Sequence, residues 1–242
     1  MEYTCFSLAS SRASGYAYEN VAKTNREGAI TVDPLHSKAL AIHRILDLES
    51  PPRIAFLEQT DPFRLLISVI LSAQTTDRQV NLVASELFSR YPNPAELAKA
   101  DIEEVKRIIR STGYYSTKAA HIIGTAQYLE QYFNSQVPLR MEELTTLPGV
   151  GRKTASCIIG QIAGQPAIIV DTHFGRVVRR LGLTTSNNAE QVERDIASLL
   201  PPETHYRFSM TVNLHGRTTC HAKRPECAQC PLAVHCDSYP IN

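Results

Sequence analysis

Apolar residues recur at helical spacing along most of this chain, and no other feature of the sequence limits its fold as much. In the segment 63–71 they occupy the i, i+3, i+4, i+7 and i+8 positions that form one face of an amphipathic helix. No segment alternates convincingly with the period of two that marks a strand. The pattern therefore predicts an all-α protein. Helices are expected around 63–71, 80–88, 105–109, 122–129, 140–146, 152–163, 171–181, 189–199 and 203–214.

Shorter signals mark where some of these helices end. The turn Tyr91–Pro94 follows the second helix, and Gly182 lies just past the segment 171–181, where a C-terminal glycine cap belongs. The apolar run Ile168–Val170 is too brief to imply a sheet. It fits an extended, buried connector.

The first 36 residues differ from the rest of the chain. They show no sustained periodicity and are rich in Ser, Ala, Thr and Asn. We therefore expect residues 1–36 to be a mobile N-terminal extension that takes no part in the fold.

Composition and charge describe an ordinary soluble protein. The longest apolar stretch, Leu65–Ala73, is too short to cross a membrane, and the N-terminus lacks the pattern of a secretory signal. We expect a cytoplasmic protein with no membrane partner. The formal net charge of +1 does not reveal a nucleic-acid partner. Basic residues do gather locally, with five between Arg152 and Arg180 and four between Arg207 and Arg224, a pattern equally typical of solvated helix faces.

Four of the six cysteines lie within the last 23 residues, in the spacing C-x6-C-x2-C-x5-C. Because the chain shows no export signal, a disulfide framework is not expected, and a metal or cluster site is the better interpretation. Four thiolates in one loop can ligate zinc or a 4Fe–4S cluster, and the spacing alone does not choose between them. Lys223 and Arg224 lie in the same loop, where they would face phosphates. The cysteines are Cys220, Cys227, Cys230 and Cys236.

The stretch 147–153, with the sequence LPGVGRK, connects two expected helices. Gly149 and Gly151 permit backbone angles closed to other residues and leave N–H groups uncovered ahead of a helix N-terminus. Such a concavity binds a phosphate oxygen without reading sequence. Leu147 and Val150 would pin the turn to the core. A simple helix–helix connector is the alternative.

Lys153 and Asp171 are the candidate catalytic pair. Lys153 falls in the first turn of a helix, where the macrodipole and partial burial would both favour a neutral, nucleophilic amine. A phosphate-binding surface lysine is the competing interpretation. Asp171 occupies a natural N-cap position, and a carboxylate there could also stabilise positive charge developing on a sugar ring. For His173, two residues later, a structural role is favoured over a DNA contact.

Taken together, these residues resemble the endonuclease III family of the helix–hairpin–helix glycosylases. The resemblance covers about residues 37–240. Each motif alone could mislead, but all of them in this order are highly specific. The motifs are Leu71–Asp77 (LSAQTTD), the stretch 147–153, Val170–His173 (VDTH), Leu214–Arg217 (LHGR) and the cysteine spacing.

The resemblance implies a two-domain helix–hairpin–helix glycosylase fold with a DNA cleft between the domains. A six-helix barrel over 55–165 would carry the hairpin. Residues 37–54 would join 166–242 in a helical domain whose four cysteines hold a 4Fe–4S cluster. The cluster would have a structural or redox role and would not be the site of chemistry.

The resemblance also implies the reaction. The damaged base is flipped out of the duplex, since its glycosidic bond is inaccessible in the stack. Lys153 attacks C1′, Asp171 helps to activate the lysine and stabilises the oxocarbenium-like transition state, and the Schiff base undergoes β-elimination on the 3′ side. The implied partner is double-stranded DNA with oxidised pyrimidines or abasic sites, bound at the nucleoid by a monomer.

Two further positions carry roles in this resemblance. Gln74 would fill the gap left by the extruded base. The family often holds leucine at the DNA-wedging position, and here that position is Tyr114, which could wedge or stack on a base equally well. The change from leucine to tyrosine affects which contacts the protein makes with the DNA strand opposite the lesion, and it does not affect the reaction. The residues expected to contact DNA are Gln74, Tyr114, Leu147, Gly149, Val150, Gly151, Arg152, His173, Lys223 and Arg224.

Three other kinds of function compete with this one: a monofunctional glycosylase, a DNA-binding module without chemistry and a zinc-stabilised structural protein. Adenine glycosylases of the MutY type use a catalytic glutamate in the helix before the glutamine loop, but the segment 62–76 contains no acid. A helix–hairpin–helix module that only binds DNA would need neither Lys153 nor Asp171. A zinc-stabilised structural protein would lack visible absorbance. Thymine-mismatch relatives generally lack the hairpin lysine, so Lys153 favours the bifunctional enzyme.

Overall fold

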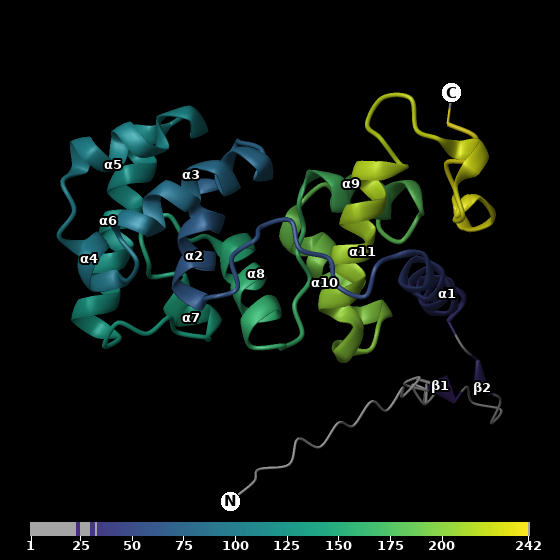
Figure 1. Cartoon of the computed structure of the whole chain (residues 1–242). Coiled ribbons are helices and arrows are strands. Elements are labelled where there is room, and N and C mark those ends of the chain that lie inside the picture. The colour runs from purple at the N-terminus through teal and green to yellow at the C-terminus, as the bar shows by residue number, and fades with distance from the viewer. Residues whose placement is uncertain (1–22, 25–29, 32, 242) are drawn as a thin grey trace, which may run out of the picture.

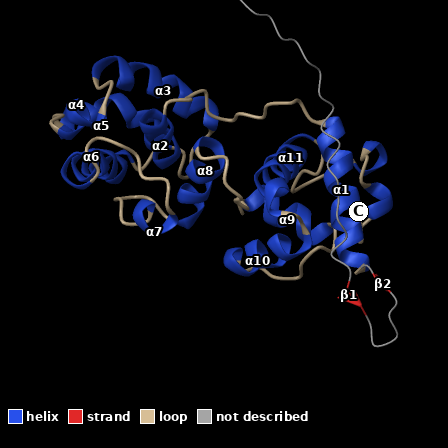
Figure 2. Ribbon diagram, turned by 90° about the horizontal axis from the view of Figure 1, so that it is seen from below, coloured by secondary structure: helices blue, strands red, loops and turns tan. Residues whose placement is uncertain are grey.

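The computed structural model describes residues 23–24, 30–31 and 33–241 (Figure 1). Helices dominate this part of the chain, and its only strands form a two-residue antiparallel pair, β1 (Lys23–Thr24) and β2 (Ile30–Thr31) (Figure 2). The all-α prediction is confirmed. The helices are α1 (Pro34–Glu49), α2 (Pro62–Leu71), α3 (Asp77–Arg90), α4 (Pro94–Ala98), α5 (Ile102–Ile109), α6 (Tyr115–Tyr132), α7 (Met141–Leu144), α8 (Arg152–Ile162), α9 (Thr172–Arg180), α10 (Ala189–Leu199) and α11 (His205–Thr218).

Helix α1 is absent from the expected helices, and it begins at Pro34, close to the end of the segment expected to be an N-terminal extension. The side chain of Asp33 accepts a hydrogen bond from the backbone N–H of Leu35 at 2.9 Å, and Pro34 occupies the first turn. An acidic N-cap followed by proline is a strong helix start. The rest of the expected extension, residues 1–22, 25–29 and 32, lies outside the described residues.

Helix α4 was also missed, because the turn residues before it act as a cap. Asn93 accepts a hydrogen bond from the backbone N–H of Glu96 at 2.9 Å, and Pro94 is the first helical residue. The turn residues that end α3 therefore also begin α4. Gly182, by contrast, lies where it was expected, just past α9 with φ of +70°.

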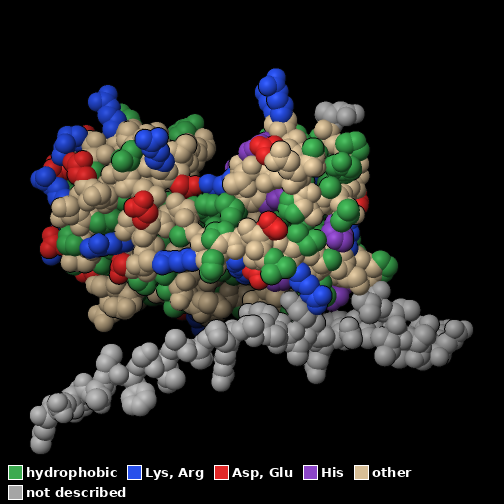
Figure 3. Space-filling model, turned by 45° about the vertical axis from the view of Figure 1, so that its right-hand side comes forward, with side chains coloured by type: hydrophobic (Ala, Val, Ile, Leu, Met, Phe, Trp, Pro, Cys, Tyr) green, Lys and Arg blue, Asp and Glu red, His purple; other side chains and the backbone are tan. Residues whose placement is uncertain are grey.

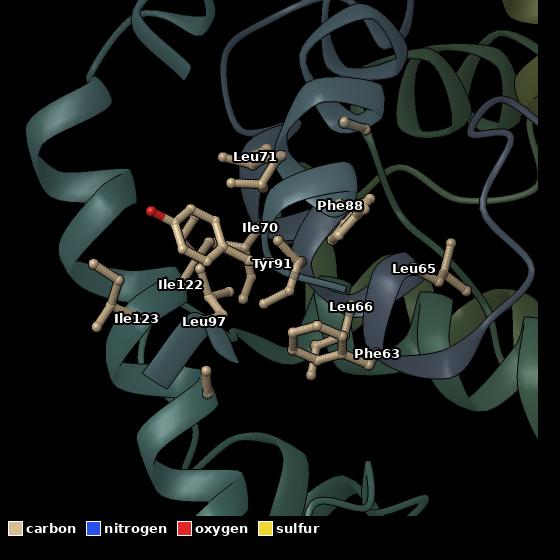
Figure 4. Packing of buried hydrophobic residues seen from close by; sticks show 14 of the residues in the cluster. Phe63, Leu65, Leu66, Ile70, Leu71, Phe88, Tyr91, Leu97, Ile122 and Ile123 are labelled. Atoms are coloured by element: carbon tan, nitrogen blue, oxygen red, sulfur yellow. The ribbon is translucent and has the colours of Figure 1, made fainter. Parts of the chain in front are cut away.

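The buried apolar side chains form two cores. The first core is built from α2 to α8. Figure 4 shows Phe63, Leu66 and Tyr91 converging with residues of α6 in its interior. The rings of Phe63 and Phe88 meet edge to face with centroids 6.3 Å apart, an arrangement that aromatic quadrupoles favour.

The second core joins α1 to α9, α10 and α11, although α1 lies more than a hundred residues earlier in the chain. Phe174 and Phe208 are fully buried at its centre, with centroids 6.1 Å apart and perpendicular rings. Figure 1 shows α1 beside this half of the molecule, away from α2.

Two segments connect the cores. The linker 50–61 runs from α1 to α2, and the segment 163–171 leads from α8 to α9. Ile168 and Ile169 are buried, and the backbone N–H of Ile169 donates to Ser209 Oγ at 2.9 Å. The predicted extended, buried connector is confirmed. Within the described residues, every helix is too short or too polar to cross a membrane.

Candidate active site

The connection between α7 and α8 is a tight hairpin anchored in the first core. Leu147 and Val150 are buried, as the sequence predicts, and the carbonyl of Pro148 accepts a hydrogen bond from Thr125 Oγ1 at 2.7 Å. Gly149 has φ of +76°, and a Cβ there would lie within 2.9 Å of the His121 ring. Only glycine fits this position without strain.

The N-terminus of α8 is open to a ligand. Among the described residues no side chain caps it, so its first N–H groups keep their hydrogen-bonding capacity. Gly151, the N-cap residue, is exposed, and a Cβ on it would meet no atom within 4 Å. Uncapped N–H groups at the positive end of a helix form a site for an anion.

A pocket of about 260 Å³, here named the central pocket, lies where the two cores meet. The first core contributes Gln74, Asp77 and Lys153, and the other side contributes Asp171 and Arg217. Residues separated by more than 140 positions in the sequence therefore share one cavity. The structure brings together the two predicted catalytic residues and the predicted gap-filling glutamine.

Lys153 lies in the first turn of α8 with an exposed side chain. Its side chain lines the central pocket. One turn later, burial raises the pKa of the Cys157 thiol to about 11, and the charge of Lys153 opposes the shift while that of Asp171 adds to it. The thiol thus lies within electrostatic range of both residues.

Asp171 caps α9. Its Oδ1 accepts a hydrogen bond from the backbone N–H of Phe174 at 2.7 Å. The side chain is half-buried and lines the central pocket. The cap holds one carboxylate oxygen, so the orientation of the group toward the pocket is fixed by the helix.

A cluster of contacts that sequence reasoning missed joins the cores beside this pocket. Arg217 on α11 forms an ion pair with Asp77 at the start of α3 and lies over the Phe56 ring at 4.1 Å. Its Nε donates to Asn213 Oδ1 at 2.7 Å. Asp77 and Arg217 each end a recognised motif, which was the available signal, whereas nothing in the linker sequence marks Phe56.

Comparison with known proteins identifies the relatives of this chain. A model of the HhH-GPD superfamily of base excision DNA repair proteins matches residues 67–202. Endonuclease III of Synechocystis is 42% identical over 202 residues, covering 83% of this chain and 92% of the relative. Endonuclease III of Escherichia coli K12 is 38% identical over 201 residues, covering 83% and 95%. The chain belongs to the endonuclease III family.

Solved structures give the same result. A non-covalent endonuclease III–DNA complex and a trapped endonuclease III–DNA covalent intermediate each superpose with a TM-score of 0.80 at 36% identity, covering 84% of this chain and 95% of the other. A thermostable thymine-DNA glycosylase, 21% identical with a TM-score of 0.78, shares the fold. The predicted helix–hairpin–helix glycosylase fold is confirmed.

The four C-terminal cysteines of this family member line one small, apolar pocket between α9, α11 and the last loop. Arg180 donates to Cys220 Sγ at 3.2 Å, and His215 Nε2 lies 3.6 Å from Cys230 Sγ. Burial lowers the pKa of His215 to about 4, so its ring is neutral at pH 7. Sequence reasoning found the cysteines but missed these two neighbours.

The chemistry of the four side chains limits which group this pocket could hold. In the described part of the chain, no three Cys, His, Asp or Glu side chains are arranged to hold a metal ion. A single zinc ion draws its sulfurs in to about 2.3 Å. Four thiols that line one pocket are a donor set that both a zinc ion and a 4Fe–4S cluster accept.

The remaining predicted DNA contacts lie outside the central pocket. Arg152 donates two hydrogen bonds of 2.9 Å to Glu193 on α10. His173 Nδ1 lies 3.4 Å from the carbonyl oxygen of Gly216, which agrees with a structural role between α9 and α11. Tyr114 is 68% exposed with φ of +47°. Lys223 and Arg224 are exposed in the cysteine loop.

Proposed function

We propose that this chain is a bifunctional DNA glycosylase and abasic-site lyase that removes oxidised pyrimidines during base excision repair. The observation that carries the proposal is the shared position of Lys153 and Asp171 on the wall of one pocket in an endonuclease III family fold. The pocket supplies a nucleophilic amine, a carboxylate fixed by its helix and a cavity open to a flipped base.

In the proposed reaction Lys153 Nζ forms a bond to C1′ of the damaged nucleotide. The glycosidic bond breaks, and the base leaves with the bonding electron pair and takes up a proton. Asp171 accepts a proton from the lysine and stabilises the positive charge that develops on the sugar. Ring opening gives the Schiff base. Loss of a 2′ proton then expels the 3′ phosphate, which cuts the strand.

The proposed DNA surface runs along one edge of the molecule. In Figure 3, Lys and Arg side chains project from both halves along the upper edge, on either side of a hollow. The uncapped N-terminus of α8 would bind a phosphate, and Gln74 would enter the space left by the base. Tyr114 would wedge into the duplex, and Lys223 and Arg224 would meet the backbone, so binding is expected to weaken with salt.

We also propose that Cys220, Cys227, Cys230 and Cys236 hold a 4Fe–4S cluster, because thiolates are its usual protein ligands and all four line one pocket. When bound, the cluster would supply a structural clasp for the last loop and would take no part in the cleavage. The first and second cores would be the two domains, with 55–165 in one and 37–54 with 166–242 in the other. The protein would act as a monomer.

Borohydride trapping on a duplex with a single thymine glycol tests the proposal. Wild type is expected to give a covalent protein–DNA complex, and Lys153→Ala is expected to give none. Lys99→Ala, at an exposed lysine outside the central pocket and the proposed DNA surface, is expected to trap as wild type does. If wild type released the base without trapping, a monofunctional glycosylase would replace this proposal. If wild type did neither on a panel of oxidised pyrimidines, the proposal would be wrong.

A further inference from the structure

A second pocket, of about 420 Å³, adjoins the central pocket. It is here named the linker pocket, because residues 52–55 of the linker form one side of it. The other side consists of Gln161, Tyr206, Arg207 and Met210. Three of these residues, Gln161, Tyr206 and Met210, also line the central pocket. The two pockets are therefore separated by little more than three side chains.

Helix geometry places Lys153 at one end of the central pocket and the linker pocket at the opposite end. The central pocket follows one face of α8 from Lys153 to Gln161, a rise of about 12 Å. It follows one face of α11 from Arg217 back to Tyr206, a rise of about 16 Å. The last turn of α8 packs against the first turn of α11, since a Cβ on Gly160 would lie 2.1 Å from Tyr206 Cδ2.

The central pocket is thus a trough with two ends. Lys153 and Arg217 mark one end, and Gln161 and Tyr206 mark the other, where the linker pocket begins. In the proposed reaction, the sugar stays bonded to Lys153 after the base is cut free. The DNA would then close the lysine end while the base still lies in the trough.

In the described structure, no side-chain hydrogen bond fixes the side chains that separate the two pockets. Among the described residues, neither the Gln161 amide nor the Tyr206 hydroxyl makes a side-chain hydrogen bond. Met210 has an unbranched chain that adapts to irregular space. Burial raises the pKa of Tyr206 to about 12, so its hydroxyl stays protonated and can donate to a passing carbonyl.

The outer wall of the linker pocket, by contrast, is held in place. Arg207 donates to Asp47 Oδ1 at 2.6 Å and to the carbonyls of Pro51 and Pro52 at 2.9 Å and 3.2 Å. Arg53 is exposed and lies close enough to Tyr206 for its charge to act on the hydroxyl. No acidic side chain lines this pocket in the described structure.

We propose that the linker pocket receives the excised base and is its route to solvent while the DNA remains attached to Lys153. The inference rests on the proposed function. Its ligand class is a small heterocycle rich in carbonyl groups, such as an oxidised pyrimidine. The donors of Arg53, Gln161 and Tyr206 complement carbonyl oxygens, and the wall without side-chain hydrogen bonds adjoins a chamber that Arg207 ties to the linker.

Blocking the linker pocket tests this route. Ala55 is exposed and lines the linker pocket but not the central pocket. Ala55→Trp places an indole ring in the chamber, Ala55→Ser changes the same position with little added bulk, and Thr60→Trp adds an indole ring at an exposed linker position outside both pockets. Each protein is trapped with borohydride on a duplex carrying a radiolabelled thymine glycol base. The label remaining on the filtered covalent complex is then followed in time.

Covalent trapping is expected to be equal within about twofold in all four proteins. Release of the label from the Ala55→Trp complex is expected to be slower by about tenfold or more, because the added ring raises the barrier to passage. Arg53→Trp, at a second exposed position in the same pocket, is expected to slow release as well. Release at the wild-type rate from both tryptophan variants would overturn the route and leave the proposed function standing. Absence of any wild-type covalent complex would overturn the proposed function and the route with it.

Discussion

Asp171 has two assigned roles, a helix cap that is observed and a catalytic carboxylate that is proposed, and two substitutions separate them. Asparagine caps a helix as well as aspartate does, but it carries no charge. Asp171→Asn therefore keeps the hydrogen bond from the Phe174 N–H, 2.7 Å long in the wild type, and removes the carboxylate. Asp171→Ala removes both.

The stability effects follow from the observed cap. Losing it in Asp171→Ala is expected to cost about 1 kcal/mol, which lowers the melting temperature by about 2–4 °C in a chain of this length. Asp171→Asn loses only the interaction of the charge with the positive end of α9, about 0.5 kcal/mol. Asn188→Ala removes an exposed N-cap of α10, does not line the central pocket and is the matched control.

The activity effects follow from the proposed charge. If the carboxylate stabilises positive charge on the sugar, Asp171→Asn and Asp171→Ala both lose about 10²–10³-fold in the single-turnover rate of base excision. Asn188→Ala keeps the wild-type rate despite its lower melting temperature. The assay is rapid-quench excision on a thymine glycol duplex, with thermal unfolding measured in parallel. An Asp171→Asn protein with wild-type excision would refute the catalytic role and leave only the cap.

Two further outcomes are expected. Gly149→Ala forces an alanine into φ of +76° against the His121 ring, so it should lower the free energy of unfolding by about 1–3 kcal/mol and weaken DNA binding. Gly151→Ala, with φ of −93° and no atom within 4 Å, should lose less stability. Equal melting temperatures for the two variants would contradict this account. The purified protein should contain about four irons and absorb visible light. Cys230→Ala should lose both signals, and zinc in place of iron in the wild-type protein would rule out the cluster.

The helices could be predicted because their signals are local. The periodicity of α2, the acidic cap of α9 and the glycine after α9 all lie within a few residues of the structure that they determine. The errors came from residues whose signal has two interpretations. Pro94 was taken as the end of one helix and is the start of the next, and Pro34 lies next to a segment without periodicity.

The pocket could be predicted only in part, because its walls come from elements that are distant in the sequence. Lys153 and Asp171 lie at helix starts, and the sequence alone locates a helix start and the residue that occupies it. Phe56 and Tyr206 have no local pattern that distinguishes them from core aromatics, and they reach the pocket only because the linker and α11 pack against α8. Pairing of Asp77 with Arg217 likewise depends on tertiary packing.

Arg152 shows why counting basic residues overstates the charge that a DNA backbone would meet. Its guanidinium lies at the start of α8, where a phosphate is proposed to bind, yet both of its hydrogen bonds go to Glu193 on α10. The pair is largely exposed on the arginine side, and such pairs contribute only about 0–1 kcal/mol. The Arg152–Glu193 pair therefore ties the hairpin to the second core, but it is too weak to compete with an anion that binds Arg152 strongly. The N–H groups at the start of α8 make no hydrogen bond to a capping side chain. In the proposed complex these protein N–H groups would hold the phosphate, and Arg152 would mainly hold the hairpin in place.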